Sequence, residues 1–153
     1  MKKFLIILGT VFLVLIIIAI VGFVLVASKG KRLDRESKQY VDEAIVSIVS
    51  GWEKQELIKR ASPELMAAVN DDGLNKVFDL CQRLGNLKEY KGPEGQSNIS
   101  LTTQHGKVIT ADYTAKADFD AGPAEIKVTL IKHGHNWQIL KFNVDSKVFL
   151  EQQ

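Results

Sequence analysis

The most apolar part of the chain is its beginning. From Phe4 to Ala27 no residue is charged, and Leu, Ile, Val and Phe dominate. A bilayer core needs about 20 such residues in a helix, so this stretch predicts a single transmembrane helix. A cleaved signal peptide is the alternative, but its apolar region is normally about 7 to 15 residues long. Val26-Ala27-Ser28 is only a weak cleavage site, and we therefore predict an uncleaved membrane anchor over residues 1–28.

A basic flank, residues 29–36, follows the anchor and begins with Lys29, Lys31 and Arg32. These three residues have two interpretations: contact with anionic lipid headgroups, or an ordinary stop-transfer flank. Asp34 and Glu36 dilute the positive charge and favour the second. The positive-inside rule would retain the rest of the chain in the cytoplasm, but long domains are translocated largely regardless of charge. Because the Met-Lys-Lys start resembles bacterial export signals, we predict a bacterial inner-membrane protein with its domain on the periplasmic or extracytoplasmic side.

Helical spacing governs the first half of the remaining chain. After the flank, apolar residues recur on one stripe of a predicted helix that reaches Trp52. Ser62-Pro63 is typical of an N-cap followed by a first-turn proline, and Gly85 is placed to stop a helix. Asn70-Asp71-Asp72-Gly73 is interpreted as a break. The predicted helices cover residues 33–52, 53–60, 64–69 and 74–84.

Strand-like alternation governs the second half, after a turn-rich connection predicted at Lys91–Gly95. The predicted strands cover residues 99–103, 108–119, 124–130 and 137–144, with one turn at Gln104–Lys107. Short connections between consecutive strands indicate an antiparallel meander. In the last strand apolar residues fall on both faces, which predicts a place inside the sheet or under a helix. The residues expected on the inner face are Ile99, Leu101, Ile109, Ala111, Tyr113, Ala115, Ala117, Phe119, Ala124, Ile126, Val128 and Leu130.

Charge and cysteine content exclude some classes of protein. All 18 acidic residues lie after Ala27, as do 18 of the 20 basic residues, because only Lys2 and Lys3 precede Ser28. From Ser28 onward, 18 minus 18 leaves no net charge. A neutral domain lacks the positive excess needed to bind a phosphate backbone, so we predict no nucleic-acid partner. Cys81 is the only cysteine and cannot form an intramolecular disulfide. It lies on an apolar helical stripe and is interpreted as a small buried hydrophobe.

Helices followed by an antiparallel sheet predict an α+β domain, residues 37–149, with helices against one face of about four strands. The pattern resembles the cystatin-like, nuclear transport factor 2-like cone, and in particular small membrane-tethered bacterial domains whose function is mostly unassigned. The resemblance rests on the order of elements, on Trp52 and on three motifs. These are Ala111-x-Tyr113-x-Ala115-x-Ala117-x-Phe119, Gly122-Pro123 and Trp137-x-Ile139-x-x-Phe142-x-Val144-x-Ser146. This superfold hosts enzymes and assembly factors alike, so the resemblance implies a fold rather than an activity.

Enzymatic members of that group resemble a cone with acidic, histidine or tyrosine side chains projecting inward. On the predicted inner face the Tyr113 hydroxyl is the only polar group, while Asp112 and Asp118 fall on the opposite face. We therefore predict no catalytic residue and no enzyme, with a small hydrolase or isomerase as the alternative. His133 and His135, with His105 in another turn, lack the further ligands of a closed zinc site, so neither a metal nor another cofactor is predicted.

Small side chains suggest where a ligand would bind. Ala111, Ala115 and Ala117, with Tyr113 and Trp137, are predicted to line an apolar pocket. In the alternative interpretation, the alanines only let the first helix pack close to the sheet. We predict a non-enzymatic accessory or assembly module that binds a protein or small apolar ligand beside a membrane protein complex. The sequence specifies neither the identity of that ligand nor the oligomeric state.

Overall fold

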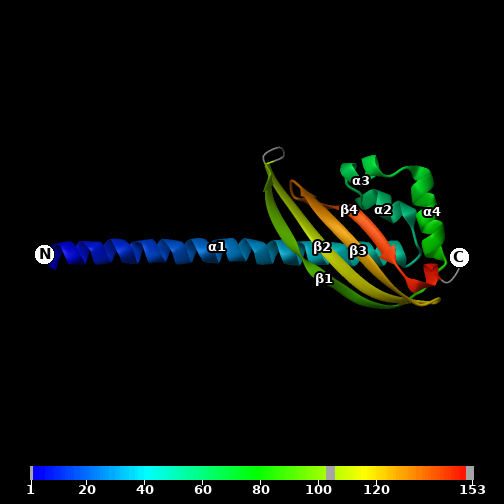
Figure 1. Cartoon of the computed structure of the whole chain (residues 1–153), viewed down its shortest axis with the longest axis horizontal. Coiled ribbons are helices and arrows are strands. Elements are labelled where there is room, and N and C mark those ends of the chain that lie inside the picture. The colour runs from blue at the N-terminus through cyan, green and yellow to red at the C-terminus, as the bar shows by residue number, and fades with distance from the viewer. Residues whose placement is uncertain (1, 103–105, 151–153) are drawn as a thin grey trace. The chain divides into compact units, whose positions relative to one another are not determined.

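The computed structural model describes residues 2–102 and 106–150 and confirms an α+β fold, with a long apolar N-terminal helix, short helices and a four-stranded antiparallel sheet (Figure 1). Two compact units, Met1–Leu33 and Asp34–Gln153, make up the chain, and each is considered by itself. The elements are α1 (Lys2–Val49), α2 (Lys54–Arg60), α3 (Pro63–Ala68), α4 (Asp71–Gln82), β1 (Leu87–Thr102), β2 (Gly106–Phe119), β3 (Pro123–His133), β4 (Asn136–Asp145) and a 3-10 turn, Lys147–Phe149.

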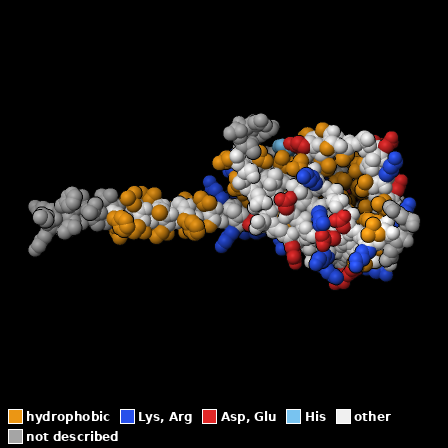
Figure 2. Space-filling model, viewed as in Figure 1, with side chains coloured by type: hydrophobic (Ala, Val, Ile, Leu, Met, Phe, Trp, Pro, Cys, Tyr) orange, Lys and Arg blue, Asp and Glu red, His pale blue; other side chains and the backbone are white. Residues whose placement is uncertain are grey.

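The unit Met1–Leu33 contains the apolar part of α1. From Phe12 to Val26 its large hydrophobic side chains are exposed on every side, and Figure 2 shows them covering this segment. Among the described residues, α1 is the helix that is long and apolar enough to cross a membrane. A signal sequence near an N-terminus has the same properties, so the structure is compatible with a membrane anchor or a signal sequence.

The short helices of the second unit begin where capping residues occur. The Ser62 side chain accepts a hydrogen bond from the Leu65 amide at 3.2 Å, which confirms the predicted N-cap of α3. The predicted break at Asn70–Gly73 is confirmed at Asn70, which lies between α3 and α4, but it is wrong for Asp71–Gly73, which belong to α4. Asn70 is the N-cap of α4, and its side chain accepts a hydrogen bond from the Gly73 amide at 2.6 Å. A polar run ending in glycine therefore starts a helix here, because Asn70 satisfies one of its free amides.

The sheet is a meander in the order β1-β2-β3-β4, and all three pairings are antiparallel. The connection predicted at Lys91–Gly95 is wrong, because these residues belong to the 16-residue strand β1. Glycine and proline occur here at irregularities of the ladder, where the register with β2 shifts. A side chain at Gly95 would place its Cβ 1.9 Å from the Asp112 carbonyl oxygen, so close strand approach requires this glycine.

The hairpin between β1 and β2 is only partly described. The turn predicted at Gln104–Lys107 includes residues 103–105, which lie outside the described residues, and His105 is among them. Gly106 and Lys107 belong to β2. The predicted strand at 99–103 is thus the end of the much longer β1.

Strand β4 is an edge strand, so it does not lie inside the sheet. The other predicted place, under a helix, agrees with the structure, because α2 and α3 contact this strand. The register with β3 shifts at Leu140: Ile139 pairs with Leu130, and Lys141 already pairs with Thr129. This bulge reverses the alternation, so that apolar residues on both sides of it face the same inner side. A backbone bridge from Ala61 to Ile139 covers part of the free edge, with the Ser62 amide donating to the Ile139 carbonyl at 2.8 Å.

The core lies between the inner face of the curved sheet and residues 34–49 of α1, with α2, α3 and α4 beside β4 (Figure 1). Trp52 closes one end: its indole nitrogen donates to the Gly85 carbonyl at 3.2 Å, and its ring lies 5.1 Å from that of Phe119. The predicted inner face is confirmed by burial from Ala111 to Phe119 and from Ala124 to Leu130. It is wrong for Ile99 and Leu101, which are 50% and 82% exposed. These two residues extend beyond the elements that cover the sheet.

Candidate functional site

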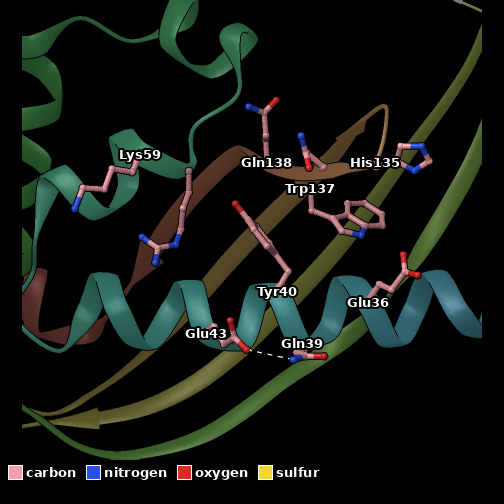
Figure 3. Close-up of a pocket in the computed structure, with 10 residues that line it drawn as sticks. Glu36, Gln39, Tyr40, Glu43, Lys59, His135, Trp137 and Gln138 are labelled. Carbon is pink, nitrogen blue, oxygen red and sulfur yellow. Dashed lines mark hydrogen bonds between the residues drawn. The ribbon is translucent and has the colours of Figure 1, made fainter.

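A polar groove of about 600 Å³ lies between α1, α2 and the start of β4. Small-molecule sites typically have volumes of about 300–1,000 Å³. Figure 3 shows Tyr40 rising from α1 and Trp137 descending from β4 into this space. Its walls carry both acidic side chains, such as Glu43, and basic ones, such as Arg60. The groove therefore has mixed charge and no strong preference for an anion or a cation.

Trp137 is a buried residue in the wall of this polar groove. The ring is 7% exposed, and the Lys132 ammonium group lies 5.2 Å from its centroid. Lys132 is itself held by an ion pair with Glu36 at 2.9 Å. A cation over an indole face is attracted by the ring quadrupole, which positions the ring. Within the described residues, the indole nitrogen of Trp137 is buried and has no hydrogen-bond partner.

Tyr40 and Arg60, two titratable residues of the polar groove, are poorly suited to acid–base chemistry. Burial raises the pKa of Tyr40, and the nearby positive charge of Arg60 only partly opposes this effect. Arg60 donates to the Glu56 carbonyl at 2.9 Å and forms an ion pair with the Glu56 carboxylate. Tyr40 therefore stays protonated at neutral pH, and Arg60 already has an anionic partner.

A second, apolar pocket of about 330 Å³ lies between α2, α3, α4 and β4. Its lining comes from helix residues such as Leu57, Leu65 and Phe78 and from Phe142 of β4. Val77, also in the lining, is 48% exposed. Figure 2 shows hydrophobic side chains reaching the surface over this part of the domain. This apolar pocket has the size and surface that suit an apolar group.

The predicted pocket residues are not brought together in one opening. Ala111 and Ala115 are fully buried and Ala117 is 2% exposed, so a ligand would reach them only if α1 moved. Tyr113 is also buried, at 2%. Trp137 lies apart from these four residues, in the polar groove. The alanine-lined ligand site stays a prediction.

Tyr113 belongs instead to a polar cluster of Asp34, Ser37, Ser97 and Tyr113, in which Ser37 and Tyr113 are buried and Asp34 and Ser97 are half-buried. The Tyr113 hydroxyl lies 2.8 Å from the hydroxyl of Ser37 and donates to the Asp34 carbonyl at 3.1 Å. The Asp34 carboxylate accepts hydrogen bonds from the Ser97 amide, at 2.8 Å, and from the Ser97 hydroxyl. Burial raises the pKa of Tyr113. The cluster joins α1 to β1 and β2, which is a structural role.

The remaining candidates have separate places. His133 pairs with Glu64 at 2.9 Å, His135 lines the polar groove, and the described residues contain no group of three potential metal ligands. Cys81 is 3% exposed, and burial raises its pKa to about 11, so the thiol is inert at neutral pH. The exposed residues Lys29, Lys31 and Arg32 lie in the first unit.

Sequence reasoning missed the apolar pocket. Its walls come from three helices and one strand that are distant in the sequence, and the apolar residues of each helix also predict ordinary core packing. One available signal was Phe142, an apolar residue out of phase with the alternation of β4. No protein-family model matches this chain, and no curated protein matches it either.

Proposed function

We propose that this chain is a membrane-anchored, non-enzymatic accessory or assembly module that binds an apolar group of a small ligand or of a partner protein. The apolar pocket between α2, α3, α4 and β4 carries this proposal. Ligand sites are mostly concave and apolar, and Val77 makes this one accessible from the surface. Burial of an apolar group there would remove both its own surface and that of the pocket from water.

The proposed location is a bacterial inner membrane, with the domain on the periplasmic or extracytoplasmic side beside a membrane protein complex. The apolar segment of α1 supports the anchor. The Met-Lys-Lys start supports export. A tether raises the effective concentration of the domain near other proteins of the same membrane, which suits an accessory module.

The proposed fold family is the cystatin-like, nuclear transport factor 2-like cone. Its support is the element order, in which helices precede a four-stranded antiparallel meander. The burial of residues 34–49 of α1 against the inner face of the curved sheet is in keeping with such a cone.

A small hydrolase or isomerase acting in the polar groove is the alternative. Such an enzyme would need a carboxylate or another base available to the substrate. The Glu36 carboxylate, on the groove wall, is paired with Lys132 at 2.9 Å, and the raised pKa of Tyr40 makes it a weak acid. These two features favour binding. Glu43 and His135, which also line the groove, are the residues that such an enzyme would use as a base.

Filling the apolar pocket tests the proposal. Ala68 lines the pocket, whereas its exposed neighbour Ala67 does not, so Ala68→Phe and Ala67→Phe form a matched pair on α3. The full chain in lipid nanodiscs is titrated with indole, a small apolar probe, while methyl NMR signals of Leu65 and Val77 are followed. We expect saturable shifts in the parent and in Ala67→Phe, and loss of these shifts in Ala68→Phe.

A photo-crosslinking residue in place of Val77 tests for a partner protein in cells. We expect one discrete adduct that Ala68→Phe removes and Ala67→Phe retains. If a chain that remains folded in the membrane showed no saturable indole binding and formed no such adduct, the proposed binding function would be refuted. Loss of both signals in Ala67→Phe and Ala68→Phe alike would exclude the apolar pocket as their source.

A further inference from the structure

The inner face of the sheet continues past its cover toward the tip of the β1–β2 hairpin. Ser97 pairs with Ala111, Ile99 with Ile109, and Leu101 with Lys107. Because side chains alternate with a period of two, all of these pairs lie on the same face as the buried Ala111. At the tip, however, Ile99 is 50% exposed and Leu101 is 82% exposed. Figure 2 shows hydrophobic side chains on the surface at this end of the sheet.

Hydrogen bonds within the second unit establish which end of the domain this tip occupies. Tyr113 of β2 bonds to Ser37, and one step toward the tip Ser97 bonds to Asp34. Positions of the hairpin closer to Leu101 therefore lie beside earlier residues of α1. The exposed Ile99 and Leu101 lie at the end of the domain where the chain arrives from the anchor.

Chain length limits how far this end can lie from the bilayer. Residues 28–33 separate Ala27, the last residue of the apolar segment, from Asp34. Even fully extended, this connection spans at most about 25 Å. From Ser97 the strand needs only four more residues to reach Leu101, which is roughly 13 Å. The tip can thus reach the headgroup region of the same membrane.

The chemistry of the tip matches that region. Leu101 and Ile99 are large aliphatic side chains, and the exposed Lys107 faces Leu101 across the hairpin. Aliphatic residues that enter the boundary between headgroups and acyl chains, beside a basic residue near anionic lipid, are the features of interfacial membrane contact. A partner protein could also contact these aliphatic residues, but the anchor keeps only the membrane close to them.

We propose that Ile99 and Leu101, on the inner face of the sheet near the end of the β1–β2 hairpin, form a second membrane contact in the headgroup region of the bilayer holding the anchor. This inference rests on the membrane anchoring proposed above but not on the apolar pocket. The anchor and the hairpin would hold the domain at two points, which restricts its rotation on the tether and gives the apolar pocket a defined direction relative to the membrane.

Lipid-borne quenchers test this contact. The full chain with Cys81→Ala carries one new cysteine, at Leu101→Cys or, as a matched control, at Ala121→Cys, the exposed turn at the opposite end of β2. Each is labelled with the same polarity-sensitive fluorophore and reconstituted in phosphatidylcholine–phosphatidylglycerol vesicles. Some of the lipids carry a nitroxide at the headgroup or on the upper acyl chain. We expect at least about twofold stronger quenching, with blue-shifted emission, at position 101 than at 121.

A third probe, at Lys107→Cys, removes the possibility that the fluorophore itself drives insertion. Lipid quenching of the fluorophore at position 107 is compared between the chain with Ile99 and Leu101 and the chain with Ile99→Asp and Leu101→Asp. The two introduced charges should abolish the quenching. Flotation of the vesicles after carbonate extraction checks the anchor independently. Protein that fails to float overturns the anchor. If the protein floats but quenching at positions 101 and 121 is equal or absent, the hairpin contact is overturned. A blue shift that increases with protein density, without quenching by the labelled lipids, also overturns it, because it indicates contact with another protein molecule.

Discussion

The two ends of the β1–β2 hairpin have the same architecture and opposite environments. Toward the turn after β2, the inner face carries Ala115 and Phe119, which are 0% and 3% exposed. Toward the hairpin tip, the same face of the same strand pair carries Ile99 and Leu101, both exposed. The covered end packs against residues 34–49 of α1, whereas the open end extends past Asp34. Alternation thus selects a face, and the neighbouring element decides whether that face is buried.

The boundary between the two ends is the polar cluster of Asp34, Ser37, Ser97 and Tyr113. Its hydrogen bonds satisfy polar groups at the position where the apolar cover ends. Ser37 is fully buried, and hydrogen bonds with the Asp34 carbonyl, at 3.2 Å, and the Tyr113 hydroxyl, at 2.8 Å, satisfy its hydroxyl. The cluster therefore joins α1 to β1 and β2 at the position where the covered part of the inner face ends.

The sharpest test of this comparison is one leucine at each end. Leu130→Ala should lower the free energy of unfolding by about 2–5 kcal/mol, because it leaves a cavity at a fully buried site. Leu101→Ala, at 82% exposure, should change it by less than about 0.5 kcal/mol. Urea unfolding of the full chain in detergent, followed by tryptophan fluorescence, measures both. Equal losses would mean that the open end is buried in solution.

Ala115→Leu separates the two interpretations of the alanine residues. The site is fully buried beneath α1, so overpacking should cost about 1–3 kcal/mol. Ala121→Leu in an exposed turn is the control and should be nearly neutral. The same urea titration applies. A stable Ala115→Leu variant would indicate free space beside the alanines, as the ligand-pocket interpretation predicts.

Alkaline pH should weaken the covered part of the domain through Cys81. Burial raises the pKa of this thiol from 9.0 to about 11, so the folded state binds the proton more tightly than the unfolded state does. The resulting stability is complete below about pH 9 and is lost as pH rises through about 11, a change on the order of 1–2 kcal/mol. Urea midpoints between pH 8 and 11 should fall less steeply in Cys81→Ala. An unchanged slope would mean that the thiol is accessible to water.

Among the changes at buried residues, Tyr113→Phe should have the smallest effect, about 1 kcal/mol, because the variant loses hydrogen bonds to Ser37 and Asp34 and keeps the ring. Ser100→Ala, at an exposed position of β1, is the control. Hydrogen exchange should show faster opening of β1 near Ser97 in Tyr113→Phe alone. Unchanged exchange would mean that the cluster does not hold α1 to the hairpin.

Local sequence signals predicted most of the helices and strands, but they did not predict where β1 begins. The Ser62-Pro63 cap and the alternation of residues 108–119 act over neighbouring residues, and both predictions agree with the structure. Gly92, Pro93 and Gly95 have strong turn propensity, yet they lie in a strand because cross-strand pairing with β2 outweighs that propensity. The bulge at Leu140 was equally hidden, since a change of alternation is visible only against its partner β3.

The sequence by itself determined the apolar N-terminal segment, the α+β order, and the face of β2 and β3 that carries apolar residues, because hydrophobic periodicity is a local property of the chain. Only the tertiary structure decided which part of that face is covered and where the two pockets form. It also placed the apolar tip of the hairpin at the anchor end of the domain. Burial and concavity depend on which distant segments meet, and that arrangement is not encoded in the spacing of neighbouring residues.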